Sequence, residues 1–203
     1  MRGAVRRVPG PLVPRVAAVA GGSWQDWPTK GTVMRISIAV ASKHGSTAEI
    51  AATIGEEITA AGHEVTVHDM ASSSVLELDD AGAIILGSAI YYGHWLLPAQ
   101  VFTEDLGLRL DGRPVWMFSS GPVGEPARPD PTTVDVEDQL VLMQPREHRV
   151  FAGRLEKARL HRGERAVATA LRSPEGDFRD WDDVRGWARD VARALDEART
   201  TTA

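Results

Sequence analysis

Donor-rich residues lie where an apolar run, Ile36 to Ala41, gives way to the polar sequence SKHGST. A phosphate monoester carries nearly two negative charges and three acceptor oxygens, so its binding site needs several donors in one concave loop. The hydroxyls and backbone amides of this stretch can supply them, and its glycine lets the backbone turn tightly against a ligand. A helix that begins directly afterwards adds the partial positive charge of its N-terminus. The sequence predicts an anion site formed by Ser42, Lys43, His44, Gly45, Ser46 and Thr47.

Several side chains of this loop have more than one interpretation. Lys43 either adds a positive charge to the anion site or is a solvated surface lysine. His44 either donates to the anion or faces solvent. Ser46 or Thr47 is expected to cap the helix, since both residue types are favoured at that position.

Two further polar segments with glycine follow apolar runs, and both are suited to hold a flat ring. SAIYYGHW (88–95) follows AIILG, and SSGPVG (119–124) follows PVWMF. In the first segment we expect backbone contacts and stacking by one tyrosine, with Trp95 in the core. In the second segment, backbone amides can reach the polar edge of the ring, and no acidic residue precedes Glu125. The residues assigned to the ring are Ala89, Ile90, Tyr91, Tyr92, Gly93, His94, Ser119, Ser120, Gly121, Val123 and Gly124.

His94 lies in the first of these segments and has a reference pKa near neutrality, so it can act as a proton donor to a bound ring. The alternative is a structural or solvent-facing histidine. The sequence singles out no catalytic residue.

The elements that position these segments alternate between strand and helix. Strands are expected at 35–41, 64–68, 83–87, 114–118 and 149–152, and helices at 47–61, 98–106, 134–143, 164–171 and from 180 onward. Such alternation implies a parallel sheet covered on both faces, with the ligand outside the carboxyl ends of the strands. The apolar faces expected to turn inward are Ile50, Ala51, Ile54, Ile58 and Ala61; Leu97, Val101, Phe102 and Leu106; and Trp181, Val184, Trp187, Ala188, Val191 and Leu195.

Composition limits the class of protein. The 203 residues suit one domain with appendages, and the net charge of −5 argues against a general nucleic-acid binder. The absence of cysteine excludes disulfides, thiolate chemistry and cysteine-ligated metal, and the six histidines have no metal-ligand spacing. No apolar run approaches the roughly 18 residues of a membrane span. We therefore predict a cytoplasmic protein without a metal site.

Familiar motifs of other α/β classes are absent. The sequence contains neither a Walker phosphate loop nor the Rossmann glycine fingerprint, and Gly87-Ser88-Ala89 does not extend to a hydrolase elbow. A phosphoacceptor receiver domain would need carboxylates where Ser42 and Ser88 stand.

The first 33 residues differ in character from the rest. Prolines and arginines interrupt their apolar stretches, which disfavours a signal peptide. They are expected to be either a disordered extension or the product of a start codon assigned too far upstream, because Met34 stands directly before the first strand. The domain is therefore expected to span 34–198.

The three polar loops, in this order and spacing, resemble those of the flavodoxin family. SKHGST is similar to the flavodoxin phosphate loop, although His44 stands where many flavodoxins carry threonine, and GSAIYYGHW and SSGPVG are similar to the two loops that flank the flavin ring. Within the family, the chain most resembles the menaquinone-dependent protoporphyrinogen IX dehydrogenases and their flavodoxin-domain relatives. That similarity covers residues 34–195 and rests on G-S-A-I-x-Y-G-H, on A-G-x-L (Ala152, Gly153, Leu155) and on the start of the last helix (Asp180, Trp181, Val184, Trp187, Ala188, Arg189).

The resemblance implies the fold class α/β, with a flavodoxin-like doubly wound five-stranded parallel sheet of order 2-1-3-4-5 and helices on both faces. It also implies FMN as cofactor, with its phosphate on residues 42–47 and its ring between the other two segments. The implied activity is that of an FMN-dependent oxidoreductase or electron-transfer protein. In the enzyme subgroup this means removing hydrogens from protoporphyrinogen IX, in heme biosynthesis, and passing electrons to a quinone or another redox partner.

One segment departs from that subgroup. There, a long basic insert between the last strand and the last helix is linked with substrate and membrane contact. Here the segment 153–178 is shorter but still basic, through Arg154, Lys157, Arg159, Arg162 and Arg165. One interpretation is that the segment binds a porphyrin carboxylate or an anionic partner, which includes peripheral contact with a membrane. The other interpretation is that it is a solvated surface segment. The alternative function is a non-enzymatic flavodoxin-fold module with weak or no FMN binding.

Overall fold

The computed structural model describes residues 33–121, 134–170 and 174–200. The expected extension at 1–33 therefore lies outside the described residues, apart from Val33. The strands are β1 (Arg35–Ala41), β2 (Glu64–Asp69), β3 (Ala83–Tyr91), β4 (His94–Trp95), β5 (Val115–Ser120), β6 (His148–Phe151), β7 (Arg154–Leu155) and β8 (Gly176–Asp177). The helices are α1 (Ser46–Ala60), α2 (Leu97–Gly107), α3 (Glu137–Met143), α4 (Arg162–Ala170) and α5 (Trp181–Thr200), with short 3-10 helices η2 (Val75–Leu78) and η4 (Lys157–Arg159).

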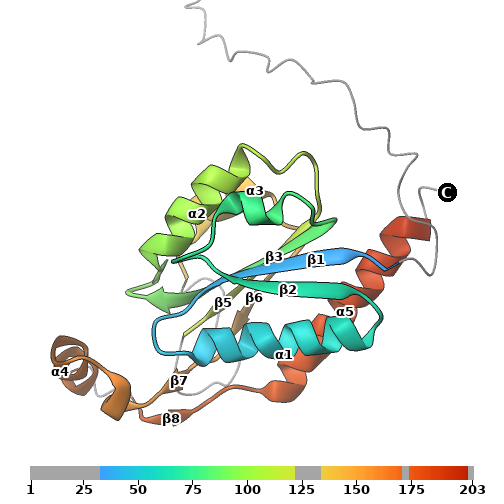
Figure 1. Cartoon of the computed structure of the whole chain (residues 1–203). Helices are drawn as coiled ribbons and strands as arrows, with labels where there is room; N and C mark the ends of the chain where they lie inside the picture. The colour runs from blue at the N-terminus through green and yellow to red at the C-terminus, as the bar shows by residue number, and fades with distance from the viewer. Residues whose placement is uncertain (1–32, 122–133, 171–173, 201–203) are drawn as a thin grey trace, which may run out of the picture.

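Five parallel strands form the centre of the protein in the order β2-β1-β3-β5-β6 (Figure 1). Counted along the chain, this is the predicted order 2-1-3-4-5, and the predicted α/β fold is confirmed. The short strand β4 was not predicted; it pairs antiparallel with the end of β3. A separate two-stranded sheet joins β7 to β8.

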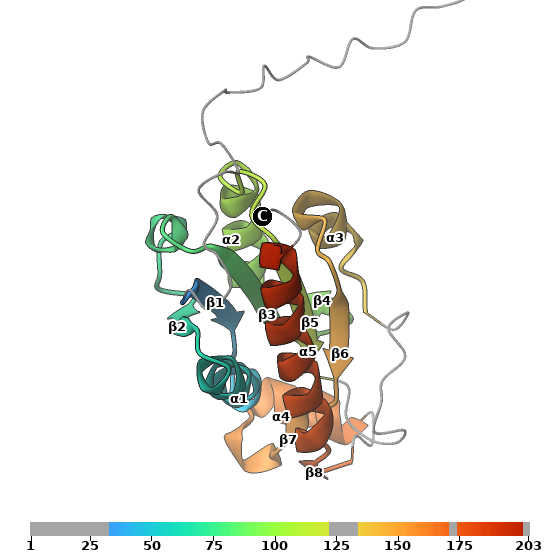
Figure 2. The same ribbon diagram turned by 90° about the vertical axis from the view of Figure 1, so that its right-hand side faces the viewer.

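Alternate residues of the central strands build two cores, one on each face of the sheet. Ile36, Ile38 and Val40 of β1 pack against α1 and α5, whereas Ala39 and Ala41 face the side of α2 and α3. Figure 2 shows α1 and α5 on one side of the sheet and α2 and α3 on the other. This two-sided burial explains why the sequences of β1, β3 and β5 are largely apolar rather than alternating.

The faces predicted for the first and last helices are largely confirmed. Ile50, Ala51, Ile54 and Ile58 of α1 are buried, but Ala61 is exposed because the helix ends at Ala60. In α5 the aromatic ring of Trp187 packs on Phe118 and Phe151, with centroids 6.2 and 5.7 Å away. Asp180 caps α5 as predicted, since its carboxylate accepts from the amides of Asp182 and Asp183.

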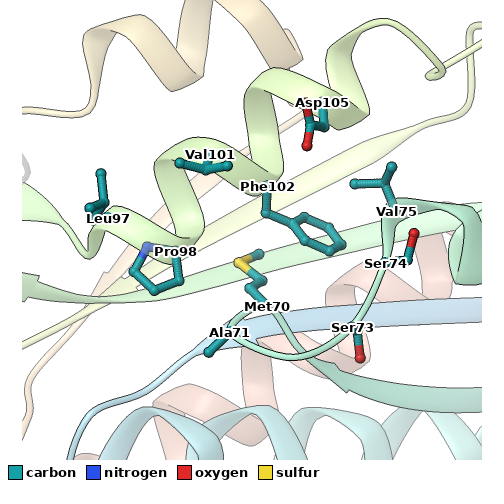
Figure 3. Close-up of a pocket in the computed structure, with 10 residues that line it drawn as sticks. All are labelled: Met70, Ala71, Ser73, Ser74, Val75, Leu97, Pro98, Val101, Phe102 and Asp105. Carbon is teal, nitrogen blue, oxygen red and sulfur yellow. The ribbon is translucent and has the colours of Figure 1, made fainter.

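The predicted inward face of α2 was half wrong. Phe102 and Leu106 are buried, but Leu97 and Val101 are 68% and 49% exposed. These two side chains line a shallow hollow of about 410 Å³ between α2 and the segment that follows β2, with Met70 and Phe102 at its floor (Figure 3). The helix turns its smaller residues, Ala99 and Thr103, toward the sheet instead.

The segment 153–178 contains regular structure. It forms β7, η4, α4 and β8, which lie together at one end of the molecule next to the start of α1 (Figure 1). The helix predicted at 164–171 is present as α4. Among the described residues, no helix is long and apolar enough to cross a membrane.

Gly87 tests the core packing. An added Cβ at Gly87 would overlap the ring of Phe118, so Gly87→Ala should lower the free energy of unfolding by about 1–3 kcal/mol. The matched control is Gly186→Ala in α5, where no described atom beyond the neighbouring residues and the local helix backbone lies within 4 Å of the new carbon, and here stability should rise by up to about 1 kcal/mol. Urea unfolding measures both. Equal stability of the two variants would contradict the described packing.

Candidate functional site

The candidate site lies at the carboxyl edge of the sheet, where the ends of β1, β3 and β5 are in register. Ala41 is paired with Ser88, and Ser88 is paired in turn with Ser119. The three polar segments predicted from sequence therefore begin side by side. A parallel sheet places its ligands at this edge, because the strand order reverses between β1 and β3.

In the loop after β1, backbone amides at the start of α1 are available to bind an anion. Gly45 has left-handed backbone angles (φ 87°) and is the N-cap residue of α1, so the prediction that Ser46 or Thr47 caps the helix was wrong. No side chain caps this helix, which leaves amides of its first turn without a side-chain acceptor. An anion is a suitable partner for such amides, because the helix dipole adds to their attraction.

Two buried hydroxyls at this edge of the sheet test whether the site suits a polar ligand. The Oγ atoms of Ser42 and Ser120 are shielded from solvent, and no described residue hydrogen-bonds to either. Ser42 follows β1 and Ser120 ends β5, so the two hydroxyls lie at the same edge of the sheet. A buried polar group without a partner costs about 1–3 kcal/mol, which a bound polar ligand would recover. These residues therefore fit a polar ligand at this edge.

The second segment is a hairpin and not the open loop that was predicted. β3 continues to Tyr91, and β4 returns through a two-residue turn at Tyr92 and Gly93, whose φ values of 53° and 88° are those of the tight turns typical of hairpins. The hairpin tip is anchored by Asp135, whose amide donates to the Gly93 carbonyl. Its carboxylate lies 3.4 Å from His94 Nδ1.

The hairpin approaches the loop after β1. Lys43 Nζ lies 5.2 Å from the centroid of the Tyr91 ring, and the His44 ring lies 6.3 Å from it. Tyr92 is 78% exposed, whereas Tyr91 is half-buried. Tyr91 is thus the tyrosine that the fold holds against the anion loop.

The third segment begins later than predicted. Ser119 and Ser120 are the last residues of β5, buried and paired with both β3 and β6, so they are strand and not loop. Gly121 follows, and a Cβ there would lie 3.0 Å from the Ile90 carbonyl oxygen, which shows how closely this segment packs against the hairpin. Val123 and Gly124 lie outside the described residues.

Ser119 has a structural role that the sequence did not indicate. Trp95, buried as predicted, donates from Nε1 to Ser119 Oγ over 2.8 Å, and the same oxygen lies 2.8 Å from His148 Nε2. Burial lowers the pKa of His148, which keeps its ring neutral. Ser119 can therefore accept from Trp95 and donate to His148, which joins the hairpin, β5 and β6 at the carboxyl edge.

The segment 153–178 contacts the anion loop, a feature that sequence reasoning did not predict. The Arg154 amide donates to Ser46 Oγ over 3.2 Å, and Arg159 Nη1 lies 3.5 Å from the His44 carbonyl oxygen. Glu49, in the first turn of α1, receives both Arg154 and Arg179. Arg179 is buried beneath the Trp181 ring, 4.4 Å from its centroid. Nothing in the local sequence distinguishes Arg179 from a surface arginine.

Comparison with known proteins agrees with this geometry. A family model for the flavodoxin domain matches residues 37–182. The protoporphyrinogen IX dehydrogenase (quinone) of Escherichia coli strain K12 is 23% identical over 177 residues, which cover 81% of this chain and 98% of that protein.

Solved structures share the fold. The rubredoxin oxygen:oxidoreductase of Desulfovibrio gigas matches 82% of this chain with a TM-score of 0.56 and 20% identity, and the chain spans 37% of that protein's length. Flavodoxin 2 from Bacillus cereus matches 81% of the chain and 99% of its own, with a TM-score of 0.52 and 24% identity.

The buried His148 predicts a pH dependence of stability. Because burial lowers the pKa of His148 in the folded protein, the unfolded chain binds its proton more readily, so stability should fall as the pH drops below about 6.5. His148→Gln keeps an acceptor for Ser119 but cannot titrate, and it should lose less stability than the unsubstituted protein between about pH 7 and pH 5. Urea unfolding at each pH measures the difference. A pKa for His148 above about 6.5 in an NMR titration would contradict this account.

Proposed function

This chain belongs to the flavodoxin-domain family, and we propose that it binds FMN at the carboxyl edge of its sheet and carries out flavin-dependent redox chemistry. The observation that carries the proposal is the pair of buried Ser42 and Ser120 hydroxyls, for which no described residue is a hydrogen-bond partner. FMN has a phosphate and a polar ring edge, so one ligand can serve hydroxyls on two different strands.

The phosphate is assigned to the loop after β1. Ser42, Ser46 and Thr47 offer hydroxyls, and Gly45 leaves the first turn of α1 without a side-chain cap. Lys43 and Arg159 supply nearby positive charge, with Arg159 Nη1 4.0 Å from the position of a Cβ on Gly45. This donor set suits a dianion.

The ring is assigned to the space beside the hairpin and the end of β5. Backbone groups of Ala89 to Gly93 and the Tyr91 ring would hold one side, and Ser120 with Gly121 would meet the polar edge. His94, Val123 and Gly124 remain predicted contacts, whereas the hydroxyl of Ser119, also predicted as a contact, already bonds Trp95 and His148. When bound, FMN supplies one- and two-electron transfer, while the protein sets its orientation and the polarity around the ring.

The proposed reaction is removal of hydrogens from protoporphyrinogen IX, with electrons passed to a quinone. The similarity to the E. coli enzyme supports this assignment over nearly the whole length of that protein. A cytoplasmic location, a quinone or other redox partner and peripheral contact with a membrane belong to the same proposal.

Ser120 provides the sharpest test of FMN binding. Ser120→Ala should leave the stability of the flavin-free protein unchanged or raised by up to about 1 kcal/mol, because a buried hydroxyl without a described partner is removed. The same change should weaken FMN binding about fivefold, as measured by quenching of flavin fluorescence. A variant that keeps or gains stability without flavin but loses FMN affinity identifies Ser120 as a ligand contact and not as a structural one.

The neighbouring serine is the matched control. Ser119→Ala leaves the buried Trp95 indole N–H without its acceptor and should destabilise the flavin-free protein by about 1–3 kcal/mol. A protein that stays colourless and gains no absorbance band near about 450 nm with added FMN would overturn the proposed function.

The catalytic proposal is tested on the FMN-loaded protein. Under anaerobic conditions, protoporphyrinogen IX and a soluble quinone should yield porphyrin fluorescence at a rate that increases with protein concentration. With protoporphyrinogen alone, the flavin absorbance near about 450 nm should bleach, since hydrogens removed from the substrate reduce the flavin. A yellow protein that neither bleaches nor forms porphyrin would contradict this substrate while leaving FMN binding intact.

A further inference from the structure

A carboxylate lies beside the proposed phosphate site. Glu49 is in the first turn of α1, and its Oε1 atom lies 4.0 Å from the position that a Cβ on Gly45 would occupy. Hydrogen bonds from Arg179 and Arg154 outweigh the burial that would raise its pKa, so the pKa of Glu49 is lowered and the group is charged. A bare negative charge at this point would repel a phosphate dianion.

Two arginines from the far end of the chain neutralise this carboxylate. Arg154 donates to both oxygens of Glu49, over 2.8 and 3.2 Å, and Arg179 Nη1 lies 2.7 Å from Oε2. The Arg179 side chain is only 2% exposed, whereas the Glu49 side chain is 45% exposed, so the pair is shielded from solvent on the arginine side only. Such charge-assisted, partly bidentate bonds are the strong ones in proteins.

The ion pairs form a continuous network in which acidic and basic side chains alternate. Asp177 binds Arg179, Arg179 binds Glu49, and Glu49 binds Arg154. The network continues from Arg154 to Glu156 and from Glu156 to Arg159, over 3.0 and 2.7 Å. All members except Glu49 come from β7, β8 and the residues beside them. The terminal Arg159 lies over the anion loop, next to the His44 carbonyl.

The same segment also orients a donor. Because Ser46 Oγ accepts from the Arg154 amide, the single hydrogen of that hydroxyl is available for a different acceptor. Arg179 also donates to the Ser46 carbonyl oxygen over 3.3 Å, which fixes the first residue of α1.

From these contacts we infer that Arg154 and Arg179 are positioning residues for the flavin phosphate: they cancel the charge of Glu49, so that the loop can accept a dianion. The inference rests on the proposed FMN site and adds a role for the segment after β6. It makes a prediction that depends on the phosphate, because riboflavin has the same ring without that group.

The test compares the binding of FMN and riboflavin to the unsubstituted protein and to four variants. Arg154→Gln removes the paired charge but keeps the backbone amide that bonds Ser46, so FMN affinity should fall about tenfold while riboflavin affinity stays the same. Glu49→Gln should bind FMN as well as or better than the unsubstituted protein. The double variant, Glu49→Gln with Arg154→Gln, should regain most of the lost FMN affinity. Arg109→Gln is the matched control, since Arg109 also pairs with a carboxylate, that of Asp79, which lies shortly before the start of β3 and therefore at the amino edge of the sheet.

Quenching of flavin fluorescence measures each affinity, and the Arg154→Gln defect should shrink at high salt, where exposed charges are screened. Equal losses of FMN and riboflavin, or a double variant no better than Arg154→Gln, would assign the arginines a purely structural role and overturn the inference. Unchanged FMN binding by Arg154→Gln would overturn it too, with the FMN site intact. Failure of both flavins to bind the unsubstituted protein would instead overturn the proposed function, and this inference with it.

Discussion

The constraint on which the structure depends is that β1, β3 and β5 must be buried on both faces. Apolar side chains of these strands lie on both faces of the sheet, so helices have to cover the sheet from both sides. A chain that covers a parallel sheet in this way returns each time through a helix, and it leaves every strand end at the same edge. The polar segments after these strands meet because of that connectivity.

The carboxyl edge is then stabilised by polar contacts that the two cores cannot supply. On one side, Trp95, Ser119 and His148 connect the hairpin to β5 and β6. On the other, Arg154 and Arg179 connect the segment after β6 to the start of α1. Buried polar groups of this kind are costly unless each has a partner, so these contacts hold the edge in one arrangement. The hydroxyls of Ser42 and Ser120 and the indole N–H of Trp187 are exceptions among the described residues; Trp187 lies in the core, whereas both serines lie where the flavin is proposed to bind.

Local patterns predicted the fold well and predicted turn geometry less well. The approximate bounds of the parallel strands followed from apolar runs, and the Asp180 cap followed from residue type, whereas the strand order was implied by the resemblance to flavodoxins. The cap at Ser46 or Thr47 was wrong, because Gly45 takes the left-handed conformation and becomes the cap itself. Leu97 and Val101 were placed inward by helical period, but α2 buries Ala99 and Thr103 instead, together with Phe102 and Leu106.

The sequence by itself determined that residues rich in hydrogen-bond donors, glycine and aromatic rings follow three buried strands, and from this it predicted a site for an anion and a ring. Only the tertiary structure decided which of them lie together and what accompanies them. Glu49 and Arg179 are 130 residues apart, and their pairing arises because β8 brings Arg179 against the first turn of α1. Burial and ion pairing depend on packing between segments that are distant in the sequence, and the spacing of apolar residues along the sequence does not predict such contacts. For this reason the donor-rich loop 42–47 was evident from the sequence, whereas the arginines that pair with Glu49 beside it were not.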